Sequence, residues 1–169
     1  PNRQGQTMRN EQTKILAERV AHLKIEILDR DFDKKGFHAI LMVDDPEKLP
    51  QLAEILLDMQ YFVGFVTACH TDPDIEVLYQ FARHDINHRI MVQCAADKEN
   101  GVPSISSIYQ GADWHERETR DFFGVHFSGH PNMAPLILDE SDTNLKPLLK
   151  NEKTIKSKTD IFRRNADDE

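Results

Sequence analysis

Three apolar runs separated by short polar turns constrain the fold of this protein more than any other feature. They cover residues 61–70, 75–82 and 89–95, and they are rich in aromatic and β-branched side chains. Such runs favour strands, and the polar turn RHDINH between the last two favours a reversal of the chain. The sequence therefore predicts three neighbouring strands of one sheet.

The region before these strands predicts a helix and a hairpin. Apolar residues recur near helical spacing between residues 10 and 24. Residues 25–28 and 37–43 have the composition of strands, and the charged turn between them contains Gly36, which can adopt a positive φ. We therefore expect the two strands to pair as a hairpin.

A second helix is predicted from residue 46 to about residue 60. Asp45 followed by Pro46 is typical of a helix start, because the carboxylate caps free N–H groups and proline is tolerated in the first turn. The resulting order, α-β-β-α-β-β-β, predicts an α+β fold, a two-layer domain with helices on one face of a mixed sheet. A short helix at residues 104–109 and a charged helix are expected to follow it.

The protein is predicted to divide into an α+β domain, residues 1–138, and an extended C-terminal tail, residues 139–169. The tail is lysine-rich and then mixed in sign, and it contains no glycine and little apolar periodicity. Segments of this composition become ordered mainly by binding. We expect the tail to bind a partner.

The charge balance excludes some classes of partner. The 169-residue chain has a formal net charge of -8 and a sequence pI of about 5.5, whereas general phosphate-backbone binders normally carry a basic stripe. No nucleic-acid partner is therefore expected. The longest apolar runs have about half the roughly 20 residues that a spanning helix needs. We expect a cytoplasmic protein that contacts the membrane only through partners.

The two cysteines do not indicate a disulfide or a cluster site. Cys69 and Cys94 lie in apolar stretches, which favours buried thiols in a reducing compartment. Cys69 and the adjacent His70 point to opposite faces of a strand, so they do not form a nucleophile and base. Two cysteines are too few for the four thiolates that an iron–sulfur cluster would need from this protein alone.

The densest mixture of charges, aromatics and glycines lies in ADWHERETRDFFGVHFSGHP, residues 112–131. At a spacing of four residues on a helix, Glu116 can pair with Arg120 and Arg117 with Asp121. Charge spacing alone favours a solvated helix with surface ion pairs. The continuation GVHFSGHP argues against that interpretation, because it is not ordinary surface composition, and its Gly124 is typical of a helix end.

Metal and acid–base chemistry are both disfavoured in this stretch. His126 and His130 have the i,i+4 spacing of helical zinc ligands, but Gly129 lies between them and the glutamate of the HExxH pattern is absent. Glu116, Glu118 and Asp121 could act as paired carboxylates, but the neighbouring arginines are expected to hold them ionised. A raised pKa, which an acid catalyst needs, is therefore not expected.

The run SISSIYQGADWHERETRDFFGVHFSGHP resembles the signature of the thirty-kilodalton subunit family of respiratory complex I, the NADH:quinone oxidoreductase. Membrane-bound energy-converting nickel-iron hydrogenases share this family. The positions that match in order and spacing are Glu116, Arg117, Glu118, Asp121, Phe122, Phe123, Gly124, Phe127, Gly129, His130 and Pro131. The resemblance covers roughly residues 10–138.

The resemblance implies a structural subunit without a redox centre, in the hydrophilic arm of a complex I-like membrane-bound electron-transfer enzyme. It implies docking against iron–sulfur and quinone- or nickel-site subunits, which would carry the iron–sulfur clusters and a flavin or nickel–iron centre. No catalytic, cofactor or metal site is then expected on this protein, which would lie on the cytoplasmic side of the cell membrane. The signature positions and Trp114 are the expected interface.

The sequence departs from the family pattern at one place, and two other functions are possible interpretations. After Pro131 the family usually has basic residues, whereas this protein has NMAP, which favours a distant branch such as an energy-converting hydrogenase. A free-standing acid–base enzyme using Glu116, Glu118 and His130 is the first alternative. A generic α+β binding module is the second.

Overall fold

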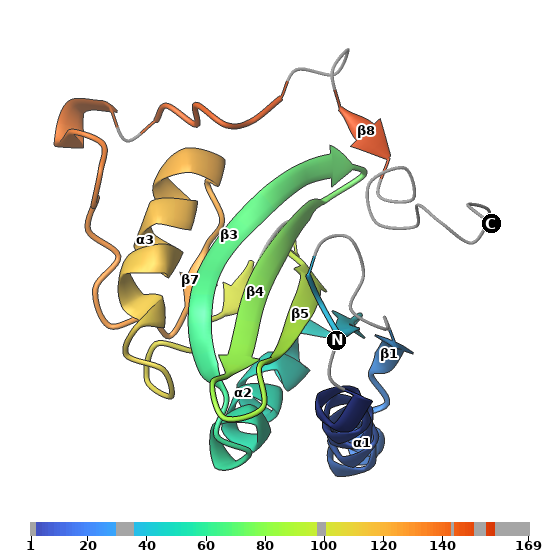
Figure 1. Ribbon diagram of the computed structural model, residues 1–169. Helices are drawn as coiled ribbons and strands as arrows, with labels where there is room; N and C mark the ends of the chain where they lie inside the picture. Colours follow the sequence, from blue (N-terminus) through green and yellow to red (C-terminus); the bar gives the residue numbers. More distant parts are fainter. Residues whose placement is uncertain (1–2, 30–35, 98–100, 143, 151–154, 158–169) are drawn as a thin grey trace.

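The computed structural model describes residues 3–29, 36–97, 101–142, 144–150 and 155–157 (Figure 1). The helices are α1 (Arg3–Val20), α2 (Leu49–Asp58) and α3 (Ala112–Phe123), with 3-10 turns at Ala21–Leu23, Pro46–Lys48 and Glu140–Asp142. The strands are β1 (Glu26–Asp29), β2 (Ala39–Val43), β3 (Phe62–Asp72), β4 (Ile75–Arg83), β5 (His88–Ala95), β6 (Val102–Pro103), β7 (Phe127–Ser128) and β8 (Lys156–Ser157).

Six of the described strands form a mixed sheet in the order β1-β2-β5-β4-β3-β8, and β6 and β7 form a separate two-stranded sheet. β1 and β2 pair antiparallel, as do β5 with β4 and β4 with β3, whereas β2 pairs with β5 in parallel. The predicted hairpin and the predicted α+β fold with a mixed sheet are confirmed. The three apolar runs identified in the sequence are the longest strands of this sheet, β3, β4 and β5.

The strand register places apolar side chains in rows across one face of the sheet. Leu41 lies opposite Val92, Val92 opposite Tyr79, and Tyr79 opposite Val66. Each of these four residues is at most 2% exposed. Side chains on one face of a strand recur every second residue, so this register builds a single apolar surface. Buried residues of all three helices belong to the same core.

The Asp45 cap forms as predicted, but the helix behind it starts later. The Asp45 carboxylate accepts the Glu47 N–H at 3.2 Å, and Pro46 stands at the first position. The first turn is a 3-10 turn, and the α-helical part begins at Leu49 and ends at Asp58. The apolar face of α2, with Leu52 and Leu56 fully buried, is the face that the sequence pattern indicates.

The predicted helix at residues 104–109 is wrong. The Ser104 N–H donates to the Ser128 carbonyl at 2.8 Å, which continues the parallel pairing of β6 with β7. Beyond it the Tyr109 N–H reaches the Ile105 carbonyl at 2.8 Å, which closes one turn. Backbone groups that pair with a distant strand are not available to a local helix, so tertiary contacts override the local preference.

The helix α3 lies beside β3, the last long strand of the sheet (Figure 1). The Thr119 hydroxyl contacts the Val66 carbonyl at 3.4 Å, a buried contact between this helix and the strand. At the far end of β3, Thr71 and Asp72 pair in parallel with β8. No helix within the described residues has both the length and the apolar character to cross a membrane.

Described parts of the predicted tail contact the protein's own domain. The Leu148 N–H donates to the Phe122 carbonyl at 3.2 Å, and the Lys150 N–H donates to His70 Nδ1 at 3.0 Å. The remainder of the tail, residues 143, 151–154 and 158–169, lies outside the described residues. The division at residue 138 and the partner-binding role of the tail stay predictions.

Replacement of Gly101 by alanine is expected to destabilise the fold by about 3 kcal/mol or more. Its φ is +72°, and an added Cβ would lie 2.0 Å from the His126 carbonyl oxygen, between β6 and β7. Gly129 is the matched control, because its φ is +78° but nothing lies within 4 Å of an added Cβ. Gly129→Ala should cost only about 1 kcal/mol of backbone strain. Urea unfolding of both variants measures the difference, and equal losses would contradict this packing.

Candidate functional site

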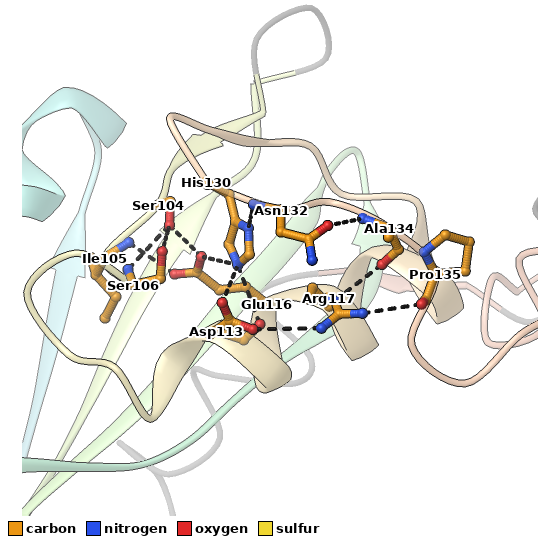
Figure 2. Close-up of polar contacts among 10 residues, drawn as sticks. All are labelled: Ser104, Ile105, Ser106, Asp113, Glu116, Arg117, His130, Asn132, Ala134 and Pro135. Carbon is orange, nitrogen blue, oxygen red and sulfur yellow. Dashed lines mark hydrogen bonds and ion pairs between the residues drawn. The ribbon is translucent and has the colours of Figure 1, made fainter.

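Three signature residues, Glu116 and Arg117 on α3 and His130 beyond it, lie in one cluster of polar contacts (Figure 2). Glu116 is fully buried and accepts a hydrogen bond from the Ser104 hydroxyl at 2.5 Å and from the Ile105 N–H at 2.9 Å. The Ser106 hydroxyl lies 2.8 Å from that of Ser104 and extends the series of hydrogen bonds. This carboxylate therefore closes the loop after β6 onto the helix.

Burial changes the acidity of Glu116. Removal of the carboxylate from water raises the pKa of Glu116 to about 7, and the charge of Asp113 acts in the same direction. The hydrogen bonds from Ser104 and Ile105 oppose this rise without cancelling it. The expectation that arginines hold this carboxylate ionised is wrong, because its contacts are neutral donors.

His130 packs against the same cluster with a fully buried side chain. Its Nε2 lies 3.3 Å from the Asp113 carbonyl oxygen and 3.8 Å from carboxylate oxygens of both Asp113 and Glu116. On the other side of the ring, Nδ1 accepts the Asn132 N–H at 3.1 Å. The ring thus joins α3 to the segment of residues 130–138, which we call the strap.

Arg117 fixes the middle of the strap. Its Nε donates to the Ala134 carbonyl at 3.1 Å, and its Nη2 donates to the Pro135 carbonyl at 3.2 Å. Its Nη1 lies 3.8 Å from the Asp113 carboxylate, one helical turn earlier. The planar guanidinium can make all three contacts at once, which an ammonium group cannot do in the same geometry.

Asp121 fixes the end of the strap. One carboxylate oxygen, Oδ2, accepts the backbone N–H groups of Leu136, Ile137 and Leu138 at 2.8, 2.9 and 3.3 Å. The other oxygen lies 3.2 Å from Arg120. Burial acts to raise the pKa of Asp121, but the three N–H groups and Arg120 outweigh it and hold the pKa below its ordinary value.

The predicted pairs Glu116–Arg120 and Arg117–Asp121 are wrong. Glu116 faces the loop after β6, Arg117 pairs with Asp113, and Arg120 contacts its neighbour Asp121. The helix turns the two acids toward backbone donors of other segments, where a buried carboxylate forms stronger hydrogen bonds than a surface ion pair offers. The charges of α3 therefore act mainly within the protein.

The other signature positions have structural places around this cluster. Gly124 ends α3 in the left-handed conformation, with φ +76°, and its N–H reaches the Arg120 carbonyl at 2.9 Å, as predicted. Phe123 and Phe127 are buried in the core and Phe122 packs against it. Gly129 and Pro131 flank His130 and are exposed. Whether these residues form an interface stays a prediction.

Two signature-region side chains face away from the cluster. Trp114 is 69% exposed, the most exposed of the large hydrophobic side chains in the described residues. Glu118 lines a groove of about 390 Å³ between β3 and α3, together with Phe65, Phe122 and Leu148. Glu116 and His130 do not line this groove, so the structure does not bring together the three residues of the acid–base alternative.

The sequence did not identify Ser104, Ser106 and Asp113 as partners of the signature acids. Their contacts join separate segments, and no local spacing encodes them. His126 lines a different hollow, with His70 and Asp97, and does not meet His130. Among the described residues, no three His, Cys, Asp or Glu side chains gather to hold a metal ion. Both cysteines were expected to be buried; Cys94 is buried, whereas Cys69 is only partly buried.

Replacement of Asp121 by asparagine is expected to lower the free energy of unfolding by about 2 kcal/mol, because charge-assisted hydrogen bonds to three N–H groups are weakened. The lowered pKa gives a sign: the Asp121 contribution is present above its unfolded pKa near 3.8 and is lost as the pH falls below it. Glu118→Gln, at a half-exposed position, is the control and should change stability by less than about 0.5 kcal/mol. Urea unfolding at pH 7 measures both variants, and equal losses of stability would contradict this role of Asp121.

Comparison with known proteins agrees with the signature. Residues 42–158 match the family model described as the respiratory-chain NADH dehydrogenase 30 Kd subunit. A polypeptide of the membrane-bound sulfane sulfur reductase, an archaeal respiratory membrane complex, superposes with a TM-score of 0.69 at 24% identity. That match covers 82% of this protein and 81% of the other, and it shows a shared fold.

Bacterial relatives are subunits of NADH-quinone oxidoreductase. The one from Mesorhizobium japonicum is 35% identical over 111 residues, which cover 62% of this protein and 55% of that subunit. The corresponding subunit of Hyphomonas neptunium is 30% identical over 135 residues, covering 75% and 67%. The present sequence spans about half the length of the Mesorhizobium protein. It belongs to the family of the 30-kilodalton subunit of respiratory-chain NADH dehydrogenase.

Proposed function

We propose that the protein is a structural subunit, without a redox centre of its own, in the hydrophilic arm of a complex I-like membrane-bound electron-transfer enzyme. Its family membership supports this proposal. The single observation in the structure that favours it is that charged signature residues make their contacts within the protein. Glu116, Arg117 and Asp121 bind backbone or hydroxyl groups of their own polypeptide, which builds a rigid part rather than a reaction centre.

The surface left by these internal contacts is the proposed docking face. Trp114 is 69% exposed on α3, and Ile137 is 58% exposed at the end of the strap. Exposed aromatic side chains on a rigid support are typical anchors of protein interfaces. The signature therefore acts indirectly at the interface, because its buried members hold the strap and helix that present Trp114 and Ile137.

The proposed partners are the iron–sulfur subunits and the quinone- or nickel-site subunit of the same complex. They would carry the iron–sulfur clusters and a flavin or nickel–iron centre, and the complex would place this protein on the cytoplasmic side of the membrane. The partner subunits would determine whether the electron donor is NADH, a reduced ferredoxin, another reduced carrier or hydrogen. A flavin subunit among the purified partners would indicate NADH, and a nickel-binding subunit would indicate a hydrogenase.

A free-standing acid–base enzyme is the second candidate, and one observation favours it. The pKa of Glu116 is raised to about 7, which suits a group that exchanges protons at neutral pH. Against it, the side chains of Glu116 and His130 are fully buried, and Glu118 lies in a separate groove. A reacting group needs contact with its substrate, so this geometry favours the structural role.

Replacement of Trp114 by alanine is expected to weaken assembly while leaving the fold intact. An exposed side chain contributes little to stability, so the free energy of unfolding should change by less than about 0.5 kcal/mol. Loss of an aromatic anchor should weaken partner binding about thirtyfold. Affinity purification of the tagged protein from its native host, with non-haem iron measured per molecule, tests this.

Leu57→Ala provides the control for that experiment. Leu57 is 49% exposed on α2, away from the strap, and its loss should leave the iron content unchanged. Recovery of the wild-type protein alone, without iron–sulfur proteins, would contradict the proposed function. Full iron content with Trp114→Ala would contradict the docking face only.

A further inference from the structure

We propose that the groove between β3 and α3 is a second docking point, which receives an apolar side chain and an adjacent lysine or arginine of an adjoining subunit. This assignment rests on the proposed function and adds the chemistry of the segment that binds beside Trp114. The groove has apolar walls, a carboxylate with a weak partner, and a position on α3 in line with Trp114.

Apolar side chains from three segments form the walls of the groove. Phe65 comes from β3, Phe122 from α3 and Leu148 from beyond the strap. The Leu148 N–H donates to the Phe122 carbonyl at 3.2 Å, which ties this wall to the helix, yet the Leu148 residue is 50% exposed. A partner that covers these side chains removes apolar surface from water, which favours binding.

The size of the groove limits what it can receive. Its volume of about 390 Å³ is near the lower end of the range for ligand sites, about 300–1,000 Å³. Val66 and Thr119, which are each 2% exposed, also line it and belong to the packed seam between strand and helix. The groove therefore suits one or two side chains of a partner and is too small for a whole helix.

One carboxylate faces this apolar groove with a weak partner. Glu118 lines the groove with a side chain that is 46% exposed, and His115 Nδ1 lies 4.0 Å from it, a distance longer than a hydrogen bond. The two arginines of α3 are engaged elsewhere, Arg117 with carbonyl groups of the strap and Arg120 with Asp121. Within the described part of the protein, no lysine or arginine lines the groove.

The charge of the groove favours a basic partner over a second copy of this protein. The formal net charge of the protein is -8, so a second copy would bring a like charge to Glu118. A lysine or arginine can lay its apolar stem along Phe122 and place its charged end at the carboxylate. Exclusion of water by the partner would strengthen that attraction.

The groove also continues the proposed docking face along α3. Trp114, Glu118 and Phe122 follow one another at intervals of four residues, so they lie on one side of the helix, about 12 Å from first to last. Trp114 is 69% exposed, and Phe122 lines the groove at the other end. A single segment of a partner can therefore contact the tryptophan, the carboxylate and the groove together.

Cross-linking from the rim of the groove tests the occupant directly. Leu148 is replaced by the photoreactive amino acid benzoylphenylalanine in the tagged full-length protein, which is produced in its native host and irradiated. The expected product is a peptide of an adjoining subunit with a lysine or arginine within about four residues of the attachment point. Leu57 on α2, replaced in the same way, is the control and should give no such peptide.

Three results of this experiment would overturn the proposal. The first is attachment to a second copy of the same protein, and the second is attachment to a peptide without a nearby basic residue. The third is the absence of any product that is specific to position 148 in preparations that contain the iron–sulfur proteins.

Charge reversal tests the role of Glu118. Glu118→Lys should reduce the recovery of the cross-linked subunit with the tagged protein about tenfold. Glu118→Gln, which removes the charge without reversing it, should give a smaller loss. Glu54→Lys, at an exposed position of α2, is the matched control and should leave recovery unchanged. The urea midpoints of all three variants should equal that of the wild type, which separates binding from folding.

A charge swap completes the test. Replacement of the basic residue found by cross-linking with glutamate should restore recovery in combination with Glu118→Lys. Failure of the swap, or unchanged recovery with Glu118→Lys alone, would overturn the groove contact while the proposed function stands. Recovery of the wild-type protein without any iron–sulfur protein would contradict the proposed function, and the proposed partner of the groove with it.

Discussion

Two buried carboxylates on one helix hold the strap and the loop after β6 in place. Asp121 gathers three successive N–H groups of the strap at one oxygen, and Glu116 gathers the Ser104 hydroxyl and the Ile105 N–H. Charge-assisted hydrogen bonds in a buried setting are strong, and the groups that they satisfy would be costly to leave without partners. Segments with little regular structure of their own thereby become fixed to α3.

This arrangement changes what the family signature means for function. Three of its charged residues, Glu116, Arg117 and Asp121, bind groups of the protein itself. The large hydrophobic side chains that α3 and the strap expose are Trp114 and Ile137. A substitution of a buried acid and a substitution of Trp114 both affect assembly in this account, but the first acts through folding of the strap and the second through contact with the partner.

Local patterns predicted the parts of the fold that depend on local physics. The apolar runs form β3, β4 and β5, Asp45 caps the 3-10 turn that leads into α2, and Gly124 ends α3. Prediction from the sequence failed where contacts between distant segments override local preference. Residues 104–109 form no helix because Ser104 pairs with Ser128, and helical spacing could not show that Glu116 binds Ser104 rather than Arg120. Such contacts join the helix to loops on either side, and spacing within the helix does not encode them.

The structure implies that Asp121 fixes the strap within this protein, without help from a partner. Hydrogen exchange of the isolated full-length protein tests it most directly, at the amides of Leu136, Ile137 and Leu138. With Asp121 bound to these three groups, they should exchange at least about a hundredfold more slowly than in an unstructured peptide. Exchange at the rate of a free peptide in the isolated protein, with protection only after a partner is added, would contradict the account.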